Sequence, residues 1–322
     1  MSVSAILAVV LGVALIAAIA VLVATEIRSK AAPRPALTPA VTGREALDAI
    51  DLGLRRLAAD CERTQRSMPD LYALGYSAER LTLRLSGADA KPPAAWTAGQ
   101  DGEEWYMAAD ELGTYAPHEA PGPSQPYALA VTLGLTGGER VLVDLSRSQA
   151  AIVVTGESDG VKQLVRAMLS ELITGPVGRQ ATVTLVGSVA TTDVTAGLGL
   201  QSARLHTVAT LEEALADAAY SGTAPRVATA DGDDSARLTQ MFRLIEGHRP
   251  LGVQGTIPHL FVMDAAQYRD EQAGTRSVRP GDALLVVGDA PDFGWRLTVL
   301  PDGRVDTGPL GIGLDVHAGR TA

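Results

Sequence analysis

The chain of 322 residues has a single cysteine, Cys61, and few aromatic side chains. One cysteine excludes an intrachain disulfide and any metal site built from several cysteines. Phenylalanine, tryptophan and tyrosine together make up 4% of the residues, so the core must be built from aliphatic side chains. Lysine is also scarce, because only Lys30, Lys91 and Lys162 occur among the 27 basic residues. A lysine at a position where chemistry would require one is therefore informative.

An excess of positive charge is missing as well. The formal net charge is -10 at pH 7. A negative surface keeps the protein soluble and disfavours wide contact with nucleic acid or with anionic lipid. We therefore expect no nucleic-acid partner.

The longest feature without charge lies at the N-terminus. The run from Val3 to Ala24 would form about 33 Å of helix, which is enough to span a bilayer once. Arg28, Lys30 and Arg34 follow the run and nothing basic precedes it, so the positive-inside rule places the C-terminal bulk in the cytoplasm. A cleaved signal peptide is the alternative, but it requires a basic segment before a shorter apolar run. We expect a single-pass cell-membrane protein whose membrane contact is this span.

The next part of the sequence predicts a small α+β subdomain. Apolar residues at near-helical spacing indicate a helix that ends near Cys61. Two hairpins are predicted after it, from segments 71–76 with 80–85 and 96–97 with 104–107. The proline-rich stretch 117–126 marks the expected boundary after this subdomain.

Strands and helices alternate in the rest of the chain, which favours an α/β fold with a mostly parallel sheet and flanking helices. The expected strands are 127–133, 140–145, 150–155, 182–186, 205–208, 258–264 and 283–288, followed by a hairpin from 294–300 and 304–307. Helices are expected after Gly156, over 211–219, and from Asp233 or Asp234 to about Gly247.

A glycine turn between a buried strand and an amphipathic helix is the most informative motif. Gly156 and Lys162 have the separation found in the phosphate-binding loop G-x-x-x-x-G-K-[ST], in which backbone amides and the lysine bind phosphates. Gly160 lies in the same turn, and Asp264 ends a later apolar strand, where a Walker B carboxylate would hold the water shell of magnesium. The sequence predicts a vestigial nucleotide site at these residues: Gly156, Gly160, Lys162 and Asp264.

This order of glycine loop, apolar strand ending in aspartate, and further apolar strand resembles the RecA-like core of the FtsK and EccC translocase ATPases. From Glu45 through Leu314 the chain is also similar to an uncharacterised module of LysM and transcriptional-activator-domain membrane proteins of high-GC Gram-positive bacteria. That similarity includes Leu142-Val-Asp-Leu before the glycine turn and the closing Trp295-Arg-Leu with Pro309-Leu-Gly. The resemblance implies a P-loop-like fold and brings no activity with it.

Several positions argue against ATP hydrolysis. Val161 replaces the second glycine of the loop, and a β-branched residue does not readily adopt glycine backbone angles. Gln163 replaces the serine or threonine that binds magnesium. Ala265 stands where the resembling translocases place a catalytic glutamate. We therefore expect no catalytic residues and no bound metal, with ATP and magnesium as the alternative cofactors.

Other catalytic patterns are weaker. Gly156-Glu-Ser-Asp-Gly160 matches a G-x-S-x-G nucleophile elbow, so a serine hydrolase using Ser158 is an alternative, with Asp264 or Asp289 and His317 as partners. No oxyanion-hole segment precedes the elbow, and Asp159 would repel a developing oxyanion. The five histidines are scattered without the i, i+4 pairing of a helical zinc site. Asp231-Gly-Asp-Asp234 lacks most of a calcium loop.

The sequence thus predicts a membrane-anchored cytoplasmic binding or scaffolding protein with a catalytically degenerate P-loop-like domain. A membrane-bound ATPase with a non-standard loop is the first alternative, and the Ser158 hydrolase is the second. Its protein partner and oligomeric state are not predicted. The expected divisions are an anchor over 1–26, a linker over 27–43, the α+β subdomain over 44–118, a linker over 119–126 and the α/β domain over 127–322.

Overall fold

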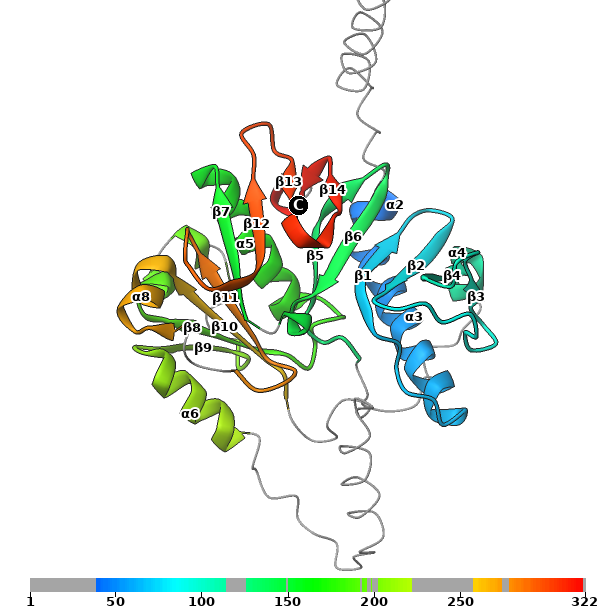
Figure 1. The fold of residues 1–322 in the computed structure, drawn as a ribbon, viewed down its shortest axis with the longest axis horizontal. Coiled ribbons are helices and arrows are strands. Elements are labelled where there is room, and N and C mark those ends of the chain that lie inside the picture. The colour runs from blue at the N-terminus through cyan, green and yellow to red at the C-terminus, as the bar shows by residue number, and fades with distance from the viewer. Residues whose placement is uncertain are drawn as a thin grey trace, which may run out of the picture. The chain divides into compact units, whose positions relative to one another are not determined.

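The computed structural model describes residues 39–113, 126–148, 150–191, 193–195, 198, 202–221, 257–273 and 278–320. All of them belong to one compact unit, Leu37–Ala322, which has a mixed α/β fold with two sheets (Figure 1). Within these ranges no helix is long and apolar enough to cross a membrane. The span predicted from Val3 to Ala24 and the helix predicted from Asp233 or Asp234 lie outside the described residues.

The first sheet has seven strands in the order β15-β5-β6-β1-β2-β4-β3, and every pair in it is antiparallel. Its strands are β1 (Leu71–Tyr76), β2 (Arg80–Leu85), β3 (Thr97–Ala98), β4 (Glu104–Ala108), β5 (Ala130–Thr136), β6 (Glu139–Asp144) and β15 (Val316–His317). Both predicted hairpins are confirmed, because β1 pairs with β2 and β3 pairs with β4.

One face of this sheet is covered by α3 (Arg44–Arg63), the helix predicted from the apolar spacing (Figure 1). Ile50, Leu54, Leu57 and Cys61 are buried against the sheet. Two short helices, α2 (Pro39–Thr42) and α4 (Ala109–Gly113), precede α3 and follow β4. The spacing of apolar residues at every third or fourth position therefore predicts both the helix and the side of it that packs on the sheet.

The boundary expected at 119–126 does not coincide with a boundary between the sheets. β6 pairs with β1, and β15 at the end of the chain pairs with β5. The physical reason is that β5 and β6 are buried on both faces. Val143 packs in the core beside α5 (Ser158–Thr174), whereas its neighbour Leu142 packs in the core beneath α3. β6 therefore contributes side chains to the cores on both faces of the first sheet.

The second sheet has eight strands in the order β14-β13-β12-β7-β11-β10-β8-β9. Its strands are β7 (Ala151–Gly156), β8 (Thr182–Val186), β9 (Leu205–Val208), β10 (His259–Asp264), β11 (Ala283–Val287), β12 (Phe293–Val299), β13 (Val305–Asp306) and β14 (Gly313–Leu314). From β12 to β9 all neighbours are parallel, whereas β13 and β14 add antiparallel strands at one edge. The predicted closing hairpin is present, and its first strand also pairs in parallel with β7.

Helices cover both faces of the second sheet. α5 packs between the two sheets, where Leu164 and Met168 share one core with Val131 of β5 and Ile152 of β7. The amide of Thr132 on β5 also donates to the α5 carboxylate of Glu171, at 3.1 Å. The opposite face carries α6 (Leu211–Ser221) and α8 (Ala265–Asp270). Short 3₁₀ turns complete the described fold: η2 (Leu145–Arg147), η3 (Gly187–Thr191), η4 (Asp193–Thr195), η6 (Gly308–Leu310) and η7 (Ala318–Arg320).

Candidate functional site

The carboxyl ends of the parallel strands carry the residues predicted for a nucleotide site. Ligands of open α/β sheets bind at this edge. Gly156 ends β7 and Asp264 ends β10, with β11 between the two strands. Asp264 is in register with Val287, which is in register with Val154, so Gly156 lies two residues further along. From strand spacing and rise, the two Cα atoms are roughly 12 Å apart, on one edge but not in contact.

Gly156 is a glycine because β12 approaches it closely. Its φ is +117°, a conformation that other residues rarely adopt. A Cβ at this position would overlap the backbone of Val299, including its carbonyl oxygen. That same oxygen accepts a hydrogen bond from the amide of Glu157 at 2.8 Å. Strand packing alone therefore accounts for this glycine.

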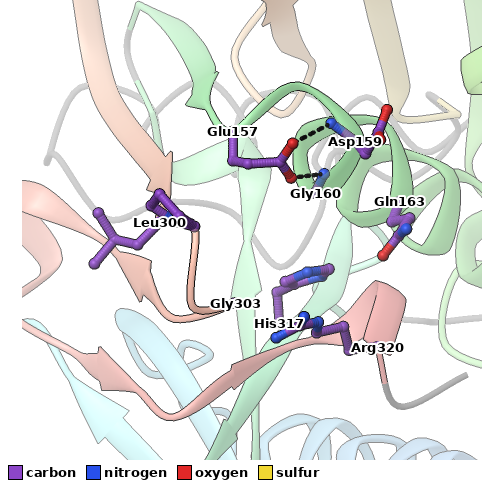
Figure 2. A pocket seen from close by; sticks show the side chains of 9 residues that line it. Glu157, Asp159, Gly160, Gln163, Leu300, Gly303, His317 and Arg320 are labelled. Carbon is purple, nitrogen blue, oxygen red and sulfur yellow. Dashed lines mark hydrogen bonds between the residues drawn. The ribbon is translucent and has the colours of Figure 1, made fainter.

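The carboxylate of Glu157 caps the N-terminus of α5. It accepts hydrogen bonds from the backbone amides of Asp159 at 3.0 Å and of Gly160 at 2.6 Å, as Figure 2 shows. These bonds, that from Gly160 first, hold the pKa of Glu157 below its ordinary value. Exposed amides at a helix N-terminus are the groups that would bind a phosphate. Here a side-chain anion of the same chain already binds them.

The segment after Glu157 is helical from Ser158 onward, so no extended loop separates Gly156 from the helix. The amide of Val161 donates to the carbonyl oxygen of Glu157 at 2.9 Å, and the Val161 side chain is buried in the core beside α5. Lys162 lies in the early turns of α5, with its Nζ 3.9 Å from Oδ1 of Asp159. Gly160 and Lys162 are thus part of the helix and do not surround a space for phosphates.

Asp264 is placed at the expected strand end, where it caps α8. Its carboxylate accepts a hydrogen bond from the amide of Gln267 at 2.8 Å and another from the hydroxyl of Ser188. Burial raises the pKa of Asp264, but the bonds from Ser188, Gln267 and the amide of Ala266 outweigh it and leave the pKa below its ordinary value. The two carboxylates at this edge, Glu157 and Asp264, therefore each cap the N-terminus of a helix.

A cleft of about 200 Å³ lies at the N-terminus of α5 (Figure 2). It is lined by the capped turn, the β12–β13 turn and the C-terminal segment, through Glu157, Asp159, Gly160, Gln163, Leu300, Pro301, Gly303, His317 and Arg320. The sequence analysis brought His317 to this turn only as a partner of Ser158 in the alternative hydrolase, and it did not single out Arg320. They follow Asp264 by more than fifty residues, and no local pattern links them to the glycine turn.

The imidazole of His317 is the most buried ionisable group of the cleft, with 1% of the residue exposed. Its Nδ1 atom has no hydrogen-bond partner. Burial, and then the nearby Arg320, lower the pKa of His317, whereas Glu157 opposes them. Arg320 is exposed and donates to the carbonyl oxygen of Asp302 at 2.8 Å. Burial therefore favours the neutral form of this ring, which lies beside a carboxylate and a guanidinium.

The residues of the alternative hydrolase are not joined into a triad. Ser158 is exposed at the start of α5 and does not line the cleft. The unpartnered Nδ1 of His317 means that no carboxylate orients this ring, although a triad requires one. Asp289 accepts a hydrogen bond from Arg296 at 2.7 Å, and Asp264 caps α8. Across the described ranges, no group of three or more His, Cys, Asp or Glu side chains is arranged to hold a metal ion.

Comparisons with solved structures give distant likenesses in fold. No protein-family model matches the chain, and no curated protein matches it. Among solved structures, the monomer form of the pCW3 conjugation coupling protein TcpA, determined with ATPγS, matches over 81% of this chain and 93% of that chain. The identity is 12% and the TM-score is 0.37, which makes this a remote resemblance in fold.

Proposed function

We propose that the chain is a membrane-anchored binding or scaffolding protein whose P-loop-like α/β domain is catalytically degenerate. The observation that carries this proposal is the carboxylate of Glu157, which occupies the amides of Asp159 and Gly160. An intact phosphate-binding loop leaves such amides open to the nucleotide. A phosphate brought to this place would meet the negative charge of Glu157, and the amides of Asp159 and Gly160 would already have an acceptor.

The order of elements supports a P-loop-like origin of the domain. A buried strand, a glycine turn and the helix α5 follow one another, and Asp264 ends a parallel strand of the same sheet. The residues at the positions that would bind ATP and magnesium do not suit these ligands. Val161 is packed in the core, Gln163 has no hydroxyl, and Asp264 already accepts bonds from Ser188 and Gln267. No reaction step through a nucleotide follows from this geometry.

A nucleotide assay tests the degenerate site. The full-length protein in detergent is mixed with a fluorescent ATP analogue and magnesium, and phosphate release is measured in parallel. We expect neither binding nor turnover, and no difference between the wild type and Lys162→Ala. Lys91→Ala serves as the control, because Lys91 is an exposed lysine far along the sequence from the turn. ATP turnover that is lost in Lys162→Ala but retained in Lys91→Ala would refute the proposal.

That refuting result would establish the alternative, a membrane-bound ATPase with a non-standard loop. Two observations favour this alternative over other enzyme classes. Lys162 retains its position after the turn, with its side chain 37% exposed, and Asp264 retains the strand end. The ATPase would require Glu157 to leave the α5 amides.

The Ser158 hydrolase has a separate test. A fluorophosphonate probe labels an activated serine covalently, so a hydrolase predicts an adduct on Ser158 that is absent from Ser158→Ala. We expect equal and background labelling of both proteins, because the Nδ1 of His317 lacks an orienting carboxylate.

The proposal also includes an N-terminal membrane anchor and a protein partner in the cytoplasm. The apolar run from Val3 to Ala24 is the proposed anchor, and the basic residues after it place the body in the cytoplasm. A reporter that is active only in the cytoplasm, fused after Ala322, should be active. Crosslinking in intact cells followed by affinity capture of the full chain should identify a protein partner. A variant lacking residues 1–36 is the matched control, which separates partners of the body from proteins captured through the membrane.

A further inference from the structure

Two ionisable groups, Glu157 and His317, lie on either side of Gly160. A Cβ on Gly160 would stand 3.0 Å from Oε2 of Glu157 and 3.7 Å from Nε2 of His317. The carboxylate and the imidazole thus border the same small space, which stays open because residue 160 has no side chain. Figure 2 shows His317 below the capped turn with Arg320 beside it.

We propose that His317 and Glu157 form a proton-operated latch, in which protonation of the buried imidazole draws the Glu157 carboxylate away from the N-terminus of α5. This proposal does not depend on nucleotide binding or on a partner. With neutral His317, the carboxylate caps α5 through Asp159 and Gly160. The C-terminal segment is held against the β12–β13 turn, since the His317 amide donates to the carbonyl oxygen of Gly303 at 3.1 Å.

The protonated ring cannot keep this arrangement. An imidazolium carries N–H donors on both nitrogens, whereas Nδ1 has no acceptor in the present packing. Burial also disfavours the charged ring, and the guanidinium of Arg320 repels it. The Glu157 carboxylate borders Nε2 of His317 across Gly160, so it is the acceptor that the imidazolium would recruit at that nitrogen.

Charged groups on the surrounding elements leave Glu157 as the favoured acceptor. Those lining the cleft are Glu157 just before α5, Asp159 on α5 and Arg320 on η7. The side chain of Asp159 is 80% exposed. On the adjoining segments, Asp302 is engaged by Arg304 at 2.7 Å, and Asp315 accepts a hydrogen bond from the amide of Gly137 at 2.9 Å. The other strand packed on this segment, β5, has no charged residue. Glu157 is therefore the negative group that borders Nε2 across Gly160.

The latch predicts that the NMR signals of two backbone amides of α5 change when His317 is protonated. The full chain in detergent micelles is followed by amide NMR between about pH 7.5 and 4.8, a range in which Glu157 stays ionised because its pKa lies below the ordinary glutamate value. The amide signals of Asp159 and Gly160 should shift with one midpoint below about 6.5. The shift should be absent in His317→Gln and present in His259→Gln, which alters a distant buried histidine. Persistence of the shift in His317→Gln, or no shift in the wild type, would overturn the latch.

A second variant keeps the test decisive if His317→Gln fails to fold. Glu157→Gln leaves the ring in place and removes the charge that favours its protonation. The titration midpoint of the His317 ring signals should then move to lower pH than in the wild type. An unchanged midpoint would show that the two groups are not coupled, and the latch would be rejected.

Discussion

The carboxylate of Glu157 accepts a hydrogen bond from the backbone amide of Gly160 at 2.6 Å, so the protein supplies its own anion to the N-terminus of α5. The bond joins the residue just before the helix to its third residue. A side chain of the same chain thus occupies the amides that a phosphate would bind at this helix N-terminus.

Removal of this cap should weaken α5. Glu157→Ala should lower the melting temperature at pH 7, because the amides of Asp159 and Gly160 lose their acceptor. Glu157→Gln should lower it less, since its amide oxygen still accepts a hydrogen bond. In the wild type the contribution should be present above the ordinary glutamate pKa and lost as the pH falls through the lower pKa of the folded protein. Thermal unfolding followed by circular dichroism checks both effects, and equal melting temperatures for all three proteins would contradict them.

Restoring the loop residues should not restore nucleotide binding. The double variant Val161→Gly with Gln163→Thr recreates the glycine and hydroxyl positions. The carboxylate of Glu157 still accepts the hydrogen bonds of the Asp159 and Gly160 amides in this variant. The variant should lose about 3 kcal/mol of stability, because a buried valine is removed and a glycine enters a helix. Calorimetry with ATP and magnesium should show no heat of binding. Binding at micromolar ATP would mean that the turn opens more readily than its hydrogen bonds suggest.

Asp264 should act as a helix cap, and its charge should matter little. Asp264→Ala should cost about 1 kcal/mol, because the amide of Gln267 loses its acceptor. Asp264→Asn should retain most of the stability, since asparagine caps helices as well as aspartate. Urea unfolding of the two variants provides the measurement. A larger loss in Asp264→Asn than in Asp264→Ala would point to a role for the carboxylate charge itself.

Gly160→Ala should destabilise the protein even though alanine favours helices by about 1 kcal/mol. The added Cβ would stand 2.7 Å from Cγ1 of buried Val299 and 3.0 Å from the Glu157 carboxylate. It would therefore displace either the strand β12 or the cap. Ser170→Ala, later in the same helix, is the control that gains helix propensity without this contact. A Gly160→Ala protein as stable as its Ser170→Ala counterpart would show that the space beside Gly160 is not filled tightly.

Stability should fall on mild acidification because buried histidines must accept protons. Burial lowers the pKa of His259, and Asp282 only partly opposes this. A pKa that is lower in the folded state means that the unfolded chain binds more protons, so stability is lost as the pH falls below about 6.5. His259→Gln should flatten the dependence of the unfolding midpoint between pH 7 and 5. An unchanged slope would assign the effect to other groups.

The sequence predicted the features that depend on neighbouring residues. The amphipathic spacing of α3 and α5, the hairpin of β1 and β2, and the strand end at Asp264 all come from local patterns. Pairing between distant segments did not follow from such patterns. The apolar run Val141-Leu-Val143 indicates a buried strand, but it does not specify that the neighbour of β6 is β1.

The candidate site shows the same division. Gly156 and Lys162 are close in sequence, so their pattern could be recognised. The capping role of Glu157 depends on where the helix begins, and an acidic residue before a helix also fits a solvated turn. His317 reaches the site only because β15 adds to the edge of β5, a contact between residues almost two hundred positions apart.

The shared seven-stranded sheet limits how this protein can be divided for recombinant work. A fragment that starts at 127 would lack β1 and leave the backbone donors and acceptors of β6 without their partner strand. A fragment that stops before Val316 would open β5 at the opposite edge. Open edges of this kind pair with other chains and promote aggregation. Any soluble piece made for crystallisation or partner screening should therefore run from Leu37 through Arg320 without a cut.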